Sequence, residues 1–156
     1  MTAPDVTAPD VTAPAAPDVT APAAPDLAAL ARAAQARAYA PYSNFRVGAA
    51  LVTRTGEVFI GANVENASYG LCVCAERTAL LAMALAGHRD FAELYVATDL
   101  TPPGSPCGMC RQTMLELTAD PTASRVVAVG PGAEQLEWTV AELIPAGFTG
   151  KQLARP

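Results

Sequence analysis

Residues 74–87, CAERTALLAMALAG, together with residues 106–110, PCGMC, decide how this chain folds. The first stretch has the apolar density of a buried helix, and each stretch places a cysteine where a helix is predicted to begin. Cys107 and Cys110 are three residues apart, so their sulfurs lie on one helix face and can hold the same ion as Cys74. Three thiolates leave one position of a zinc tetrahedron open, which is typical of a zinc site that does chemistry. We therefore predict a catalytic zinc site.

Glu76 and Arg77 lie in the first turn of the helix that Cys74 opens. Glu76 is about 200° around the helix from Cys74, so it does not share the ligand face but can reach the open position over the helix end. A carboxylate there can take a proton from the activated water and pass it to a leaving group. Three thiolates also leave the site negatively charged, and two helix N-termini and Arg77 can offset that charge by donating to the sulfurs.

The presence of Cys72 allows a second kind of zinc site. Together with the other three thiols it could complete a closed structural site, which would have no catalytic position. Against this, Cys72 is only two residues from Cys74, in a predicted loop, and Glu76 and Arg77 would then lack a purpose. The location of the Cys72 thiol decides between the two sites.

Helices and strands are predicted to alternate along the chain. The expected elements are a helix over 26–38 with Asp26 as its N-cap, strands over 46–54 and 57–64, a helix over 74–86, a strand over 93–98, a helix over 108–117, strands over 125–130 and 136–140, and a short helix over 141–143.

Two short connections predict strand directions. Thr55 and Gly56 form a compact turn that favours an antiparallel hairpin. Only residues 131–135 separate the last two strands, whereas a parallel pair would need a crossover of about a dozen residues, so these strands are expected to run antiparallel. The fold class is therefore α/β, a three-layer α-β-α sandwich around a five-stranded mixed sheet.

The N-terminal segment differs from the rest in composition. Residues 1–26 repeat the phrase TAPDV or TAPAAPDV and contain no Lys, Arg or aromatic residue. Frequent proline opposes helix and strand, and so little apolar surface cannot offset the entropy of ordering. We expect a disordered tail over 1–26 and one folded domain over 27–156.

Composition also restricts partners and compartment. A net charge of −5 works against binding nucleic acid, which relies on Lys and Arg. The start of the chain has neither the basic region nor the apolar run of a signal peptide, and the apolar stretch over 78–87 is too short to span a bilayer. We expect a cytoplasmic protein that does not bind membranes. Because the helix over 74–86 is apolar almost all round, another subunit is expected to cover one side of it.

Four blocks occur in a fixed order: PYSNFRVGAA at 41–50, NVENASY at 63–69, CAERTA at 74–79 and PCGMCRQ at 106–112. Together they resemble the small homotetrameric cytidine deaminases, and the resemblance extends from about Leu27 to Phe148. It implies zinc-dependent hydrolytic deamination of cytidine and deoxycytidine to uridine and deoxyuridine, in which activated water attacks C4 of the pyrimidine and ammonia leaves. This is a step of pyrimidine salvage, and it needs one Zn²⁺ per subunit.

The resemblance also assigns residues to roles. It makes Cys74, Cys107 and Cys110 the zinc ligands and Glu76 the proton shuttle. Within one subunit it places Phe45 near the base, Asn63 and Glu65 on the ribose hydroxyls, and the Ala75 backbone at the pyrimidine edge. Ala67, Tyr69 and Phe148 match residues that approach from neighbouring subunits, with Phe148 stacking on the base. A homotetramer with shared active sites is implied.

Several other interpretations of the sequence stay open. Phe45 and Phe148 could be core residues, and Asn63 and Glu65 ordinary surface polar residues. Blasticidin deaminases, which act on another aminopyrimidine nucleoside, share the Cys-x-Glu and Pro-Cys-x-x-Cys elements, although Asn63 and Glu65 favour plain ribosides. A nucleic-acid deaminase is disfavoured by the acidic charge and by the short last connection, because such enzymes place a helix there. A non-catalytic zinc protein that assembles through its apolar helix is a further alternative.

Overall fold

The structure, a computed structural model, describes residues 25–153, and most of the predicted tail lies outside the described residues. Five strands form one sheet in the order β2-β1-β3-β4-β5. Their bounds are Gly48–Thr53 for β1, Val58–Ala62 for β2, Phe91–Ala97 for β3, Arg125–Val129 for β4 and Gln135–Thr139 for β5. Strands β3 and β4 pair in parallel and the other neighbours pair antiparallel, which confirms the predicted mixed sheet and its antiparallel ending.

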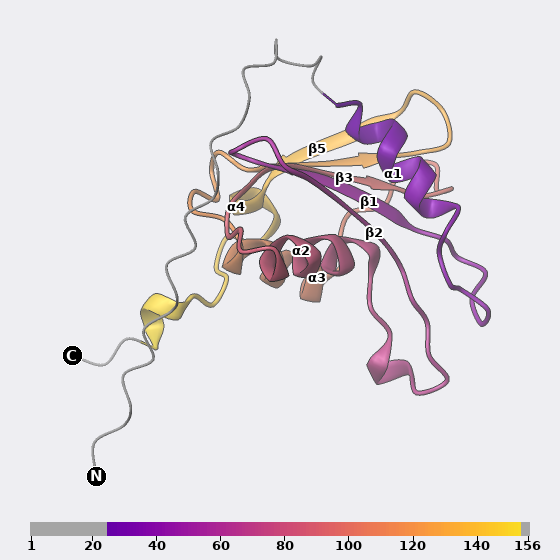
Figure 1. Ribbon diagram of the computed structural model, residues 1–156, viewed down its shortest axis with the longest axis horizontal. Helices are drawn as coiled ribbons and strands as arrows, with labels where there is room; N and C mark the ends of the chain where they lie inside the picture. Colours follow the sequence, from indigo (N-terminus) through magenta and orange to yellow (C-terminus); the bar gives the residue numbers. More distant parts are fainter. Residues whose placement is uncertain (1–24, 154–156) are drawn as a thin grey trace.

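Helices cover both faces of the sheet (Figure 1). Helix α1 (Leu27–Gln35) lies on one face, and α2 (Ala75–Leu85), α3 (Gly108–Glu116) and α4 (Val140–Leu143) lie on the other. Two 3₁₀ turns, η1 (Tyr69–Leu71) and η2 (Gly150–Gln152), complete the described elements. This is the predicted three-layer sandwich. None of the described helices is long and apolar enough to cross a membrane.

The end of α1 differs from the prediction. Asp26 caps the helix as expected, accepting from the Ala29 amide at 3.0 Å. The helix ends at Gln35, however, and not at Ala38. The reason is tertiary: Tyr39 donates its amide to the Asn63 carbonyl at 3.0 Å and accepts from the Glu65 amide at 2.8 Å. These bonds tie the loop before β1 to the loop after β2, and both loops carry predicted site residues. The other predicted bounds agree with the structure to within two residues.

Helix α2 lies directly on the edge strand β2 at Gly61. A Cβ atom built on Gly61 would come within 2.4 Å of the Ala75 carbonyl oxygen and 2.5 Å of the Ala79 amide nitrogen. Both are backbone atoms, so the helix itself would have to move. Glycine at this position therefore sets how closely α2, which begins beside Cys74, approaches the sheet.

We expect Gly61→Ala to destabilise the domain by about 1–3 kcal/mol or more, because the added methyl overpacks a backbone contact. Equilibrium urea unfolding of the zinc-loaded protein measures this change. Gly132→Ala is the matched control, since nothing lies within 4 Å of a Cβ atom at that position. Equal unfolding free energies for the two variants would contradict the close contact.

Candidate metal centre and active site

Three thiols meet where α2 and α3 begin. Cys74 is the N-cap of α2, Cys107 is the N-cap of α3, and Cys110 lies in the first turn of α3. The Cys74 and Cys107 sulfurs are 3.8 Å apart, those of Cys107 and Cys110 are 3.5 Å apart, and all three lie within 4.8 Å of one another. With Zn–S bonds of about 2.3 Å, two sulfurs of a tetrahedral site lie about 3.8 Å apart. The cluster therefore fits one zinc ion held by three thiolates.

Cys72 is not a member of this cluster. Its sulfur accepts from the Asn66 amide at 3.3 Å and donates to the Asn66 carbonyl at 3.6 Å. It lines a different cavity, together with Glu65 and Tyr69. The structure therefore does not place four thiols around one metal position. Three thiols surround it, and the fourth coordination position has no thiol.

The surroundings of Cys74 favour its thiolate form. The pKa of Cys74 is lowered to about 5, mainly by hydrogen bonding with Cys110 and also by Cys107 and the positive charge of Arg77, while burial opposes the shift. The hydrogen bond with Cys74, together with burial, raises the pKa of Cys110, so within this pair Cys74 is the thiolate and Cys110 the donor. The N-terminal ends of α2 and α3 both point at the sulfurs, as predicted, and their partial positive charge stabilises anionic ligands.

Arg77 contacts the loop beside the cluster. Its Nη2 donates to the Cys72 carbonyl at 2.9 Å, and its buried Nε has no hydrogen-bond partner among the described residues. An unpaired buried donor is costly, and an adjacent electron-rich group such as a zinc-bound thiolate would satisfy it. Arg77 therefore lies between the loop and the ligand Cys74. It contacts Cys72 at the backbone carbonyl of that residue and not at its thiol.

Glu76 faces the thiols from within a cavity of about 230 Å³. Cys74, Cys107, Phe45 and Asn63 line the same cavity. Glu76 is only 4% exposed, and this burial raises the pKa of its carboxyl group, as does the negative charge of Cys74. A carboxyl group with a raised pKa holds a proton more readily than an ordinary carboxylate, which suits a group that takes up a proton and passes it on.

The other wall of this cavity was not predicted from the sequence. Val96, Thr98, Leu100, Gly104 and Ser105 form it, at the carboxyl end of β3 and in the loop that follows. A usable signal was present, because this loop is rich in Pro and Gly and leads straight into the second cysteine pair. Strand β3 is parallel to β4, and loops at the carboxyl ends of parallel strands commonly line ligand sites.

Asn63 reaches the cavity while holding its rim. Its Oδ1 accepts from the Val47 amide at 2.8 Å, and its Nδ2 donates to the Phe45 carbonyl at 2.9 Å. The side chain therefore fixes the backbone that carries Phe45, and both residues line the cavity. Their contact with the substrate stays a prediction.

Glu65 lies instead in a second cavity of about 360 Å³, with Tyr42, Ser43, Tyr69 and Cys72. Its carboxylate accepts from the Ser43 hydroxyl and from the amides of Tyr42 at 2.9 Å and Ser43 at 3.2 Å. The Ser43 hydroxyl, assisted by these amides, lowers the pKa of Glu65. Within one subunit, the carboxylate thus holds the loop before β1 and does not line the thiol cavity.

The remaining predicted contacts divide into a buried and an exposed group. Ala75 is fully buried at the first position of α2, beside Glu76. Ala67 is exposed, Tyr69 is 76% exposed and Phe148 is 53% exposed. None of these three lines the thiol cavity of its own subunit.

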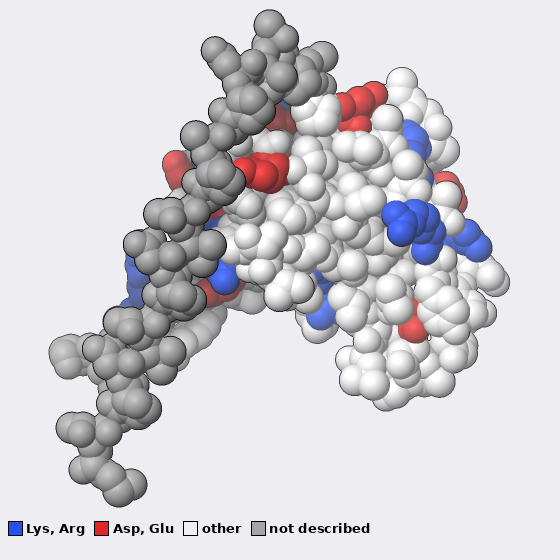
Figure 2. Space-filling view, viewed as in Figure 1, with Lys and Arg blue, Asp and Glu red and all other residues white. Residues whose placement is uncertain are grey.

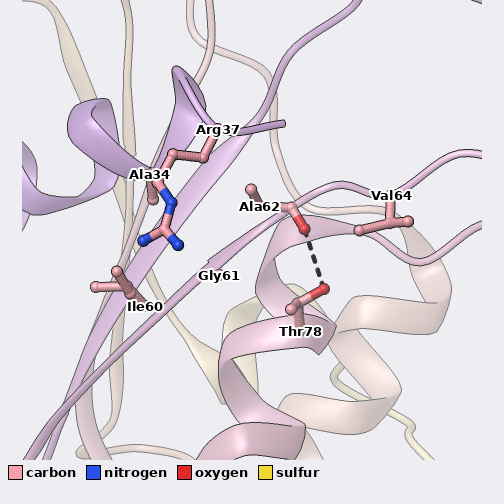
Figure 3. A pocket seen from close by; sticks show the side chains of 7 residues that line it. All are labelled: Ala34, Arg37, Ile60, Gly61, Ala62, Val64 and Thr78. Carbon is pink, nitrogen blue, oxygen red and sulfur yellow. Dashed lines mark hydrogen bonds between the residues drawn. The ribbon is translucent and has the colours of Figure 1, made fainter. Parts of the chain in front are cut away.

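Another hollow, of about 250 Å³, lies between α1, β2 and α2 (Figure 3). In it, the Arg37 guanidinium lies near Ile60, and the Thr78 hydroxyl donates to the Ala62 carbonyl at 3.1 Å. Its lining residues include no thiol and no carboxylate among the described side chains. The cavity of Glu76, which two thiols of the cluster also line, is the candidate active site.

Known proteins share both the fold and the motifs. Residues 24–127 match the family described as cytidine and deoxycytidylate deaminase zinc-binding region. A cytidine deaminase from Halalkalibacterium halodurans is 48% identical over 123 residues, which are 78% of this chain and 92% of that protein. A probable cytidine deaminase from Dictyostelium discoideum is 41% identical, over 79% of this chain and 82% of that protein.

Among solved structures, a cytidine deaminase from Burkholderia pseudomallei superimposes with a TM-score of 0.74 at 51% identity, covering 78% of this chain and 96% of that one. The three-thiol cluster, the buried glutamate and the mixed sheet thus occur in a sequence that aligns with these deaminases over most of their length. This chain belongs to the cytidine and deoxycytidylate deaminase zinc-binding family.

Proposed function

We propose that this protein is a zinc-dependent cytidine deaminase, which hydrolyses cytidine and deoxycytidine to uridine and deoxyuridine and ammonia in pyrimidine salvage. The observation that carries the proposal is the buried carboxylate of Glu76 in one cavity with the thiols of Cys74 and Cys107. Its relatives of similar length are named cytidine deaminases, which fits the same reaction.

Cys74, Cys107 and Cys110 would hold the zinc ion, which when bound would supply Lewis-acid activation of the attacking water. The Glu76 carboxylate would take one proton from the attacking water and pass it to the pyrimidine ring nitrogen, and would then move the second proton, from the hydroxyl added at C4, to the 4-amino group, which leaves as ammonia. Burial of Glu76 keeps solvent from competing for these protons. Glu76 is the catalytic residue of this proposal.

Other residues bind and orient the nucleoside. Phe45 packs near the base, the Ala75 backbone meets the pyrimidine edge, and Asn63 faces the ribose. Glu65 is assigned to the ribose hydroxyls as well, which requires its carboxylate to exchange the Ser43 hydroxyl for a substrate hydroxyl. A carboxylate and an amide are suitable partners for a diol.

We propose that the protein forms a homotetramer in which neighbouring subunits share active sites. The connection between β2 and α2 extends away from the body of the molecule at the lower right of Figure 1, and it carries the exposed Tyr69 and Leu71. Helix α2 also leaves Leu81 55% and Leu85 92% exposed. Apolar side chains so exposed favour an interface, and Ala67, Tyr69 and Phe148 are the proposed contacts with neighbouring sites.

A free nucleoside suits the surface better than a polyanion. On the face shown in Figure 2, uncharged atoms predominate, and Lys and Arg side chains form only small separate groups. The whole chain has a net charge of −5. We assign the protein to the cytoplasm, with the catalytic domain over 27–156 and a tail over 1–26 that takes no part in the reaction.

A spectrophotometric assay of zinc-loaded protein tests the proposal, with cytidine, deoxycytidine, blasticidin S and a cytosine-containing oligonucleotide as substrates. Turnover of the two plain nucleosides, with no product from the oligonucleotide, is the expected result. Turnover of blasticidin S alone would assign the chain to the rival nucleoside, and turnover of none at full zinc occupancy would overturn the proposal.

Arg77→Gln is expected to reduce kcat/KM by about 10- to 100-fold at full zinc occupancy, the usual effect of losing a partner of metal ligands. The cause is the loss of the positive charge that Arg77 places beside the Cys74 ligand. Steady-state kinetics are compared with thermal unfolding, which should change less. Arg37→Gln, in the hollow of Figure 3, is the control for removing an arginine. Unchanged turnover would remove Arg77 from the mechanism.

A further inference from the structure

Helix α3 does more than present two thiols. Behind the cysteines it anchors the segment that follows α4. Arg111 donates from Nη1 to the Leu143 carbonyl at 3.0 Å, and Gln112 donates from Nε2 to the Phe148 carbonyl at 2.7 Å. Between these two bonds, a Cβ atom on Gly147 would come within 2.3 Å of Cδ2 of Leu115. The backbone from 143 to 148 is therefore fastened to α3 at three points.

The segment is held by its backbone while the aromatic ring at its end is left free. Phe148 is 53% exposed and does not line the thiol cavity of its own subunit. Leaving a large apolar ring half in water has a free-energy cost, which is recovered if the ring enters another subunit. A fixed backbone lowers the entropy lost when the ring docks, which is the usual benefit of preorganisation.

Gln112 and Arg111 differ in what else they hold. Arg111 also donates to the Pro106 carbonyl at 2.7 Å and to the Ser105 hydroxyl at 2.9 Å, so its loss would disturb the loop that precedes Cys107. The Gln112 side chain, by contrast, makes one hydrogen bond among the described residues, and its acceptor is the Phe148 carbonyl. Gln112 can therefore be changed without touching the ligand loop.

We propose that Gln112 is a positioning residue that presents the Phe148 ring to the substrate cavity of a neighbouring subunit. This rests on the proposed function, in which Phe148 stacks on the base in the site of another subunit. Each zinc-bearing helix would then complete two sites: its own through Cys107 and Cys110, and its neighbour's through Gln112.

The first test compares Gln112→Ala with wild type, Thr113→Ala and Phe148→Ala, all at measured zinc content. Thr113 is a matched control, because its hydroxyl donates within α3 to the Met109 carbonyl. Gln112→Ala should raise KM for cytidine about three- to tenfold, the effect of losing one hydrogen bond, with kcat within about twofold of wild type. Phe148→Ala should raise KM at least as much. A purely structural role would lower the melting temperature without changing KM.

The second test shows whether Gln112 acts across subunits. Gln112→Ala subunits are coexpressed, under a separate tag, with an excess of Glu76→Gln subunits, which have an intact Gln112 but no proton shuttle. If Phe148 comes from the neighbour, KM per active site should return to the wild-type value in the mixed assemblies. A KM that stays raised in them would overturn the proposal.

The two proposals fail in different ways. No turnover of cytidine by wild type would end the proposed function itself. An unchanged KM in Phe148→Ala would show that Phe148 does not contribute to substrate binding. A raised KM in Phe148→Ala with a normal KM in Gln112→Ala would rule out the positioning role of Gln112 alone.

Discussion

Glu76→Gln is expected to lower kcat for cytidine by about 10²- to 10⁴-fold, the usual contribution of a positioned acid–base group, with zinc still bound. The amide has nearly the shape of the carboxylate but cannot take a proton from water. The three thiols of the cluster hold the metal and Glu76 does not, so the change removes proton transfer without removing a ligand. Glu76 is 4% exposed, and the amide fills the same buried space. The measurement is a cytidine assay on protein whose zinc content is known.

Glu142→Gln is the matched control for this prediction. Glu142 is exposed and caps α4 by accepting from the Thr139 amide at 2.7 Å, so its substitution tests the loss of a carboxylate outside the cavity. Its kcat should stay within about twofold of wild type. If Glu76→Gln turned over cytidine at the wild-type rate with full zinc, another group would have to move the proton.

Cys107→Ala is expected to abolish both zinc binding and turnover, whereas Cys72→Ala should keep about one zinc per subunit. Two thiols cannot replace three, because a catalytic zinc site takes three protein ligands. Cys107 is the informative ligand to remove because it is exposed, whereas Cys110 is fully buried in the core and its loss would also leave a cavity. Elemental analysis and the cytidine assay give the two readouts.

The comparison between the two cysteine variants also separates the two kinds of zinc site. The Cys72 sulfur is hydrogen-bonded to the backbone of Asn66, away from the cluster. Its loss should therefore affect the loop and leave the zinc content unchanged. Equal zinc loss in Cys72→Ala and Cys107→Ala would establish the closed four-thiol site. Removal of zinc by a chelator should inactivate wild type and Cys72→Ala alike, and restored zinc should restore both.

Local signals in the sequence predicted most of the fold. The antiparallel ending was predictable because five residues are too few for a crossover, and the starts of α2 and α3 were predictable because cysteines precede helical patterns there. The end of α1 was not, since its helical pattern continues to Ala38 while the strand-like bridge between Tyr39 and Val64 comes from residues far along the chain.

For the candidate site, spacing alone placed Cys107 and Cys110 on one helix face and Glu76 within reach of the metal position, because helix geometry relates residues only a few positions apart. It left Cys72 undecided, and it did not predict that Asn63 and Glu65 would each hold the loop before β1 by hydrogen bonds. Only the tertiary structure brought Cys74 within 3.8 Å of Cys107, sent Cys72 to another cavity and left Phe148 outside its own site. The physical reason is that such distances depend on how the sheet packs two helices from separate parts of the chain, which no local pattern encodes.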